Sequence, residues 1–183
     1  VIGVSACGSL REEIAPEDIV IPDQLFDFTK GRDSSFFGGG IVVPVRVRKP
    51  FCPDLSQKLY ESVSKSGATV HKGGNSITIE GPRFSTKAES HIFRQWNADV
   101  INMSTVPEVV LAREAGICYA IVAMSTDYDC FMEDRPAVTI DEVLKVMKQN
   151  ADNVKRLLME VIPKIDYIEC KCKDDIKTSI IGG

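Results

Sequence analysis

The chain contains no long apolar run and no excess of positive charge. None of its 183 residues belongs to an apolar stretch near the roughly 18 residues that a membrane-spanning helix needs. Lys and Arg number 22 against 26 Asp and Glu, so the formal net charge is -4. Because nucleic acids attract basic protein surfaces, we expect neither a nucleic-acid partner nor a membrane partner.

Residue patterns typical of metal and redox sites are also missing. The sequence has two histidines, and none of its six cysteines forms a CxxC pair or lies at zinc-ligand spacing. We therefore expect no bound metal. We interpret Cys118 as a small apolar residue inside a strand, and Cys170 and Cys172 as exposed thiols, with a redox pair as the alternative. Reduced cysteines indicate the cell interior, so we expect a cytoplasmic protein, with the nucleus as a further location.

Common nucleotide-binding and hydrolase motifs are absent from the sequence. It contains no GxGxxG segment, no Walker motif and no Ser-His-Asp pattern. The glycines at 38–40 lack the following helix that a phosphate loop requires. Function must therefore be inferred from where polar residues fall within the predicted fold.

Apolar runs alternate with amphipathic segments along most of the chain. This alternation predicts an α/β fold with a mixed, largely parallel central sheet flanked by helices. Strands are expected near residues 1–4, 18–22, 41–47, 71–80, 98–103 and 117–125, and helices near 54–66, 86–97, 105–116 and 139–161.

Local signals refine this prediction. Two strand-like runs around Gly73-Gly74-Asn75 indicate a hairpin. We expect one domain over residues 1–165 and a frayed tail over residues 166–183. Capping boxes that mark helix starts begin at Asp54, Thr86, Thr105 and Thr139.

Two of the predicted strands end in polar residues. The run at 98–102 leads into Met103-Ser-Thr105 and a helix start, and the run at 117–125 leads into Thr126-Asp-Tyr-Asp129. In open α/β sheets, ligands bind in the crevice at the carboxyl ends of strands. A helix N-terminus beside that crevice favours an anion. The sequence therefore predicts a small-molecule site for a ligand that carries phosphate.

Several residues in these segments each have two possible interpretations. Ser104 and Thr105 either only cap the following helix or also bind phosphate, since both roles use the same geometry. Asp127 and Asp129 are either solvated loop carboxylates or groups that bond ring nitrogens and deliver a proton to a leaving group. Phe84 either packs in the core or stacks on an aromatic ligand.

Three longer segments resemble those of one protein family. They are Gly81-Pro-Arg-Phe-Ser-Thr-Lys-Ala-Glu89, Asn102-Met-Ser-Thr-Val-Pro-Glu-Val109 and Ser125-Thr-Asp-Tyr-Asp129. Together they resemble the trimeric purine nucleoside phosphorylase superfamily, and within it the methylthioadenosine phosphorylases. The similarity runs from Val1 to about Pro163, and several long motifs in the same order make it specific.

This resemblance implies an enzyme, a pentosyltransferase. The expected reaction is the reversible phosphorolysis of S-methyl-5'-thioadenosine to adenine and 5-methylthioribose 1-phosphate, in purine and methionine salvage. Inorganic phosphate is a co-substrate, and no cofactor is expected. The resemblance also implies a homotrimer. Orientation of the substrates and stabilisation of an oxocarbenium-like transition state would supply most of the catalysis.

The resemblance assigns roles to individual residues. Asp127 would be catalytic, bonding N7 and the 6-amino group of adenine as the base leaves, while Asp129 would hold the same purine edge. Ser5, Ala6 and Ser104 match phosphate-binding positions. The other expected substrate-binding residues are Phe84, Ser85, Asn102, Met103, Thr126 and Tyr128, together with the wall around the 5' substituent, Ile140, Val143 and Leu144.

Two alternatives to this function stay open on the sequence. One is a purine nucleoside phosphorylase of broader specificity, although Asp127 favours adenine because a carboxylate accepts from a 6-amino group and repels a 6-carbonyl. The other is a truncated, non-catalytic nucleoside-binding or interaction subunit. Family members carry a glycine-containing phosphate loop and an Arg-His pair nearer the N-terminus, so we expect this chain to be the C-terminal two-thirds of the family fold.

Overall fold

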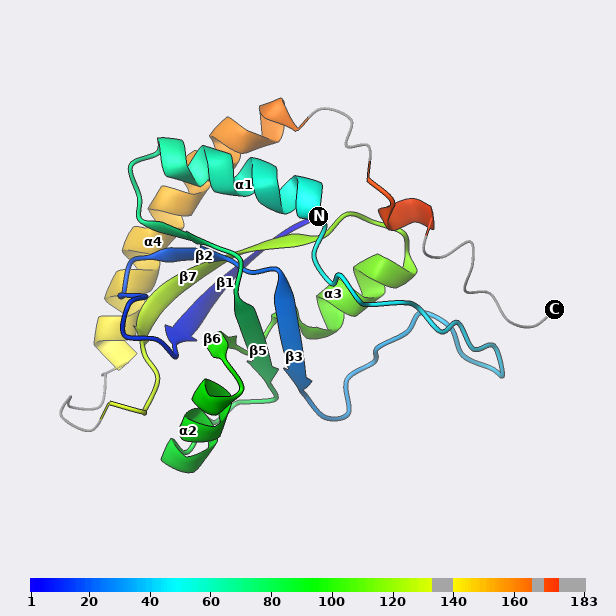
Figure 1. The fold of residues 1–183 in the computed structure, drawn as a ribbon, viewed down its shortest axis with the longest axis horizontal. Helices are drawn as coiled ribbons and strands as arrows, with labels where there is room; N and C mark the ends of the chain where they lie inside the picture. The colour runs from blue at the N-terminus through cyan, green and yellow to red at the C-terminus, as the bar shows by residue number, and fades with distance from the viewer. Residues whose placement is uncertain (133–139, 166–169, 175–183) are drawn as a thin grey trace.

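A single twisted sheet organises the protein (Figure 1). The computed structural model describes residues 1–132, 140–165 and 170–174. Within these residues seven strands form one sheet in the order β3-β5-β6-β1-β7-β2-β4. The strands are β1 (Ile2–Ser9), β2 (Ile19–Ile21), β3 (Gln24–Phe28), β4 (Val70–Lys72), β5 (Asn75–Ile79), β6 (Ala98–Asn102) and β7 (Ala120–Tyr128).

The two central strands, β1 and β7, run opposite to the others. They are parallel to each other from Ile2↔Ala120 to Ser9↔Tyr128. β6 pairs with β1 in the antiparallel sense, and β2 pairs with β7 in the same way. The remaining pairs, β3·β5, β5·β6 and β2·β4, are parallel. The predicted mixed, largely parallel sheet is therefore confirmed.

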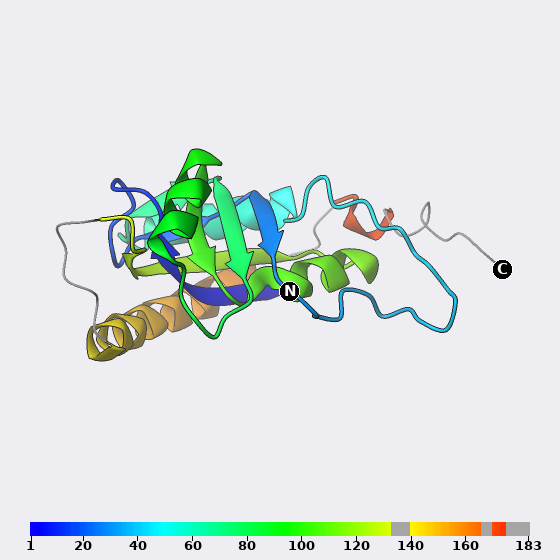
Figure 2. The same cartoon turned by 90° about the horizontal axis from the view of Figure 1, so that it is seen from below.

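The alternation of side chains along β7 divides the core into two faces. Val122 and Met124 pack with the helices α1 (Pro53–Lys65) and α4 (Ile140–Val161). Ile121 lies on the other face, with the helix α3 (Thr105–Glu114). Figure 2 shows α4 running along one side of the β1–β7 pair. Helices therefore flank the sheet, because both faces of its central strands are apolar.

The observed strands differ from the predicted ones in three ways. Residues 41–47 form no strand, and β3, which runs beside β5, was not predicted. β4 and β5 do not form the predicted hairpin, because β4 pairs with β2 while β5 pairs with β3 and β6. Gly73 and Gly74, with φ of 79° and 108°, instead turn the chain between two distant parts of the sheet.

The helices begin close to the expected residues, but their caps differ. The capping box of α2 (Lys87–Gln95) is confirmed, since Thr86 and Glu89 bond each other's backbone. α1 instead begins after Cys52, so the capping box predicted at Asp54 is wrong. Thr139 lies outside the described residues. No helix in the described parts of the chain has the length and apolarity needed to cross a membrane.

The cysteines near the C-terminus are not the exposed thiols that the sequence analysis predicted. Cys172 is only 3% exposed, in a short 3-10 helix, η2 (Cys172–Asp174), and Cys170 is half-buried. Cys118 precedes β7 and lies outside it. These cysteines pack with α1 and β7, and contacts with such distant segments leave no local sequence pattern.

Candidate active site

The polar ends of β6 and β7 meet on either side of β1. Gly8 of β1 pairs with Ile101 of β6 and with Asp127 of β7. The two ends lie together as predicted, but the reason differs, since β6 runs antiparallel to β1 and does not share a parallel edge with β7. Between Cys7↔Ser125 and Gly8↔Asp127 the register shifts, so Thr126 is an extra residue of β7. Such bulges re-aim side chains near functional sites.

Two carboxylates lie over Gly8. A Cβ atom at Gly8 would lie 3.8 Å from Oδ2 of Asp127 and 3.7 Å from Cβ of Asp129. The Thr126 hydroxyl donates to Oδ1 of Asp127 at 2.6 Å, which leaves Oδ2 as the freer oxygen. The backbone N–H of Asp129 donates to the carbonyl of Ser9 at 2.8 Å and fixes the turn after β7. A side chain at Gly8 would therefore meet both acidic residues and also Ile101, whose Cγ2 lies 3.1 Å from the same Cβ position.

Both acids have raised pKa values. Burial raises the pKa of Asp127, the hydrogen bond from Thr126 opposes this shift, and the charge of Asp129 adds to it. Burial also raises the pKa of Asp129, against the opposing effect of the Ser90 hydroxyl. A carboxyl group with a raised pKa holds a proton nearer to neutral pH, as a general acid requires.

Several buried polar atoms around these acids have no hydrogen-bond partner among the described residues. They include Oδ2 of Asp129 and the hydroxyls of Ser85 and Ser90. The Ser85 and Ser90 hydroxyls are close enough to lower the pKa of Asp129, but their geometry completes no hydrogen bond. Buried polar groups normally have partners. These atoms are therefore suited to bind the polar edge of a ligand.

A pair of hydroxyls lies at the same junction of strands. Oγ of Ser5, in β1, is 2.8 Å from Oγ of Ser104, which follows β6. Ser104 is the N-cap of α3, but its side chain makes no capping hydrogen bond. The predicted capping box at Thr105 does not form either, because Glu108 instead accepts a hydrogen bond from the Tyr119 hydroxyl. The Ser104 hydroxyl is thus available for an anion at the start of α3.

Asn102 holds this turn together through its side-chain amide. Its Oδ1 accepts from the backbone N–H groups of Ser104 and Thr105, each at 3.2 Å, and from the Thr78 hydroxyl at 3.1 Å. Its Nδ2 donates to the hydroxyls of Thr105 and Ser76. The geometry gives Asn102, predicted to bind substrate, a positioning role for Ser104.

Arg32 joins the loops that follow β5 and β6 through hydrogen bonds to their backbone, a role that the sequence did not predict. Its guanidinium donates to the backbone carbonyls of Met103 (2.8 Å), Val106 (2.5 Å) and Glu80 (2.9 Å). It also pairs with the Glu80 carboxylate at 3.1 Å. A single cation therefore fixes the ends of β5 and β6 relative to each other. Arg32 lies in an irregular loop without a motif, so no sequence signal marked this role.

The remaining candidates differ in how closely they approach this junction. Met103 packs against Gly81, where a Cβ atom would lie 2.6 Å from its sulfur. Phe84 is 74% exposed, so it is not the core residue of the alternative interpretation. The Tyr128 hydroxyl donates to the Glu12 carbonyl at 3.2 Å, so that hydroxyl is already engaged.

Four further candidates belong to β1 or α4. Ala6 precedes Cys7 in β1 and pairs with Met124. Leu144 of α4 is 54% exposed, whereas the side chains of Ile140 and Val143 lie outside the described residues. Fold and site together define an α/β protein with two carboxylates and a pair of hydroxyls at one junction of its central strands.

The chain belongs to the Phosphorylase superfamily, whose family model matches residues 1–163. It is 51% identical over 170 residues to the S-methyl-5'-thioadenosine phosphorylase of Xenopus tropicalis, covering 90% of this chain and 60% of that protein. It is 45% identical over 183 residues to the protein of the same name from Geobacter sulfurreducens, covering 99% and 64%. The chain thus spans less than two thirds of the length of these two relatives.

Solved structures show the same fold. A methylthioadenosine phosphorylase from an antarctic soil metagenomic library superposes with a TM-score of 0.93 at 38% identity, covering 98% of this chain and 64% of that one. A mutant of the adenosine/methylthioadenosine phosphorylase from Schistosoma mansoni, in complex with methylthioadenosine, gives a TM-score of 0.87 at 32% identity. That match covers 98% of this chain and 70% of the other.

Proposed function

We propose that this chain catalyses, or forms the larger part of an enzyme that catalyses, the phosphorolysis of S-methyl-5'-thioadenosine. The products are adenine and 5-methylthioribose 1-phosphate. The observation that carries the proposal is the pair of carboxylates, half-buried Asp127 and buried Asp129, over Gly8 at the same strand junction as the hydroxyls of Ser5 and Ser104. The names of the relatives, and the complex of one of them with methylthioadenosine, support the same reaction.

The reaction requires a proton at the base and an anion at the sugar. A phosphate oxygen forms a bond to C1' of the ribose as the bond from C1' to N9 breaks, and the electron pair of that bond passes to the purine. Asp127 would stabilise the departing purine by donating a proton or a hydrogen bond to N7. Its raised pKa supports this role, because a protonated carboxyl is a donor at N7 and an ionised one is not.

Phosphate would bind at the start of α3. The Ser104 hydroxyl makes no capping hydrogen bond and pairs with the Ser5 hydroxyl, and two neighbouring hydroxyls can both donate to phosphate oxygens. Ser5 and Ala6 would contribute from β1, where the bond between Ser5 and Ser104 already brings the two strands together. Ser5 and Gly8 are three residues apart, about 10 Å along a strand, which is a suitable span for a ribose between phosphate and base.

Base preference follows from the chemistry of the acids. The unpartnered Oδ2 of Asp129 is an acceptor when ionised and suits the 6-amino edge of adenine. Ser85 and Thr126 would line the same pocket, Phe84 would pack on the base, and Met103 would lie under the ribose. A 6-carbonyl would instead place an acceptor against the ionised Asp129 oxygen, and unpaired buried polar groups discriminate strongly against such a ligand. We therefore propose adenine-type substrates and no cofactor other than the co-substrate phosphate.

A homotrimer is the proposed assembly. The loop before α1 exposes apolar side chains, with Phe36 at 67%, Ile41 at 54% and Val42 at 68%. Neighbouring exposed apolar residues are typical of surfaces that bind other proteins. Contact with neighbouring subunits would cover them. Sedimentation of the purified chain tests this assignment, and a monomer at working concentration would contradict it.

The activity is tested by adenine release from methylthioadenosine with and without inorganic phosphate, using the purified chain. Release that requires phosphate and yields the sugar 1-phosphate would establish phosphorolysis. Release without phosphate would instead indicate hydrolysis and contradict the proposal. Binding of methylthioadenosine with no release under either condition would favour the non-catalytic subunit.

A further inference from the structure

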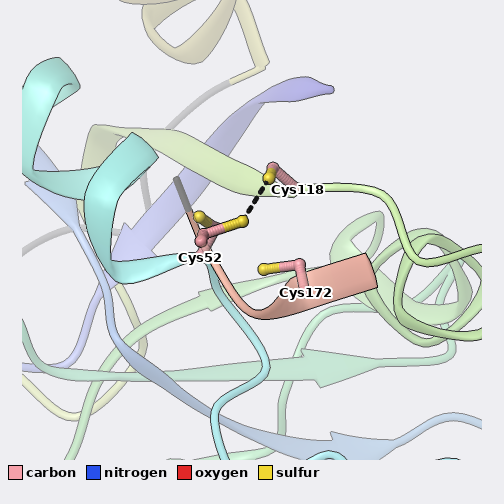
Figure 3. Close-up of side chains that lie close together, drawn as sticks. Cys52, Cys118 and Cys172 are labelled. Carbon is pink, nitrogen blue, oxygen red and sulfur yellow. Dashed lines mark hydrogen bonds between the residues drawn. The ribbon is translucent and has the colours of Figure 1, made fainter. Parts of the chain in front are cut away.

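Four of the six cysteines converge in one cluster away from the proposed active site. The Sγ atoms of Cys52, Cys118, Cys170 and Cys172 all lie within 4.8 Å of one another. Figure 3 shows Cys52, Cys118 and Cys172 pointing into the same small region. Tetrahedral zinc–thiolate bonds of about 2.3 Å place neighbouring sulfurs about 3.8 Å apart. Small side-chain rotations therefore suffice to surround one ion.

The fold brings these thiols together from three distant segments. Cys52 is the N-cap of α1, and its backbone N–H donates to the carbonyl of Tyr119 at 2.7 Å, which holds Cys52 beside the start of β7. Cys118 immediately precedes Tyr119, and its sulfur is 2.8 Å from that of Cys170. Cys172 begins η2 and is buried in the same apolar core as Cys52. Each ligand position is thus fixed by the backbone or by the core.

The surroundings suit a negatively charged metal–thiolate group. Four thiolates around a divalent cation carry two net negative charges. Cys52 is the N-cap of α1, and its side chain makes no capping hydrogen bond, so its sulfur is free to bind an ion. The positive end of the helix dipole at this position partly offsets the charge of such a group.

We propose that Cys52, Cys118, Cys170 and Cys172 form a tetrathiolate site for one zinc ion, which ties the C-terminal segment to α1 and β7. All four coordination positions are filled by protein, as in structural rather than catalytic zinc sites. The soft thiolate donors select zinc over magnesium or calcium. The site is independent of the proposed phosphorolysis, so either assignment can fail without the other.

Metal titration of the reduced chain tests this site directly. The protein is reduced with a phosphine, freed of reductant without oxygen, and titrated with Co²⁺ and then Zn²⁺. We expect one Co²⁺ per chain, with the thiolate-to-cobalt charge-transfer bands and visible bands of a tetrahedral tetrathiolate site. Stoichiometric Zn²⁺ should remove these bands. A chain that gives no such bands although all six thiols are free would overturn the proposal.

Matched variants identify the ligands. Cys52→Ala should lose the cobalt bands, whereas Cys7→Ala should keep them, because Cys7 is equally buried but lies outside the cluster. Bands that survive unchanged in Cys52→Ala would contradict the assignment. If that variant does not fold, zinc content decides the question: one zinc per chain in protein purified under reducing conditions supports the site. Disulfides within the cluster in that same protein, detected by mass after alkylation, would overturn it.

Discussion

Replacing Asp127 with asparagine tests the centre of the proposed site. The Thr126 hydroxyl donates to Oδ1 of Asp127 at 2.6 Å, and the amide oxygen of asparagine can accept the same bond. The amide –NH₂ group would then replace Oδ2, the oxygen that lies nearest to Gly8. A donor would thus meet the 6-amino group of adenine, which is itself a donor. The variant would also lose the ability to deliver a proton to N7.

The expected loss follows from the bonds that change. A hydrogen bond to a charged group contributes about 1.5–3 kcal/mol, and leaving a buried donor unpaired costs about 1–3 kcal/mol more. We take about 3–4 kcal/mol for the two effects together. Because each 1.4 kcal/mol is a factor of ten, kcat/KM for methylthioadenosine should fall about 10²–10³-fold. Nucleosides with a 6-carbonyl should lose much less, since the new –NH₂ group can donate to that oxygen.

The assay compares kcat/KM for methylthioadenosine and for inosine at saturating phosphate. The matched control is Asp152→Asn, which removes the same charge from an exposed position on α4 and should leave both values unchanged. Circular dichroism establishes that each variant is folded. Wild-type kinetics toward methylthioadenosine in folded Asp127→Asn protein would refute the role assigned to this carboxylate. An equal loss for both substrates would refute the explanation of base preference.

Three further predictions follow from the same contacts. Ser104→Ala should raise the KM for phosphate about tenfold, the effect of one hydrogen bond, while Ser64→Ala on the exposed face of α1 should not; unchanged phosphate kinetics would exclude Ser104 from the anion site. Arg32→Met should lower the free energy of unfolding in urea by about 2 kcal/mol by removing bonds to three carbonyls, and an effect no larger than that of the exposed Arg48→Met would count against this role. Because the folded-state pKa of Asp127 is raised, its contribution to stability is fully present below about pH 4 and is lost as pH rises through the folded-state pKa. Thermal unfolding should therefore find Asp127→Asn more stable than wild type at pH 7 and equal to it near pH 3, and a variant that is less stable at pH 7 would contradict the sign.

Most of the helices and central strands were predictable from the sequence. β1, β6 and β7 are apolar runs bounded by polar residues. All four helices lie near the predicted bounds, and α1, α2 and α4 are amphipathic. Strand pairing was less predictable. The turn signal at Gly73-Gly74 predicted a hairpin, yet β4 and β5 pair with strands on opposite sides of the sheet. A local turn signal predicts that the chain bends, but it does not predict which strands pair on either side of the turn.

The candidate site was predictable in its residues more than in its geometry. Asp127, Asp129 and Ser104 were identified from polar residues at strand ends and from the family resemblance. Their environment was not, because burial, the free hydroxyl of Ser104 and the bulge at Thr126 depend on how β1 pairs with both neighbours. Arg32 was missed for the same reason, since its partners are backbone carbonyls that carry no sequence identity.

The four-cysteine cluster could not be predicted from local sequence patterns. Spacing alone excluded a metal, since Cys170 and Cys172 are separated by one residue and the other two members of the cluster lie far away in the chain. The fold nevertheless places all four sulfurs within 4.8 Å. By itself, the sequence determined the helices, the central strands and most of the residues that carry chemistry, because propensity and periodicity act between neighbours along the chain. The tertiary structure decided the strand order, the juxtaposition of the two acids and the thiol cluster, because burial and pairing join segments that are distant in sequence.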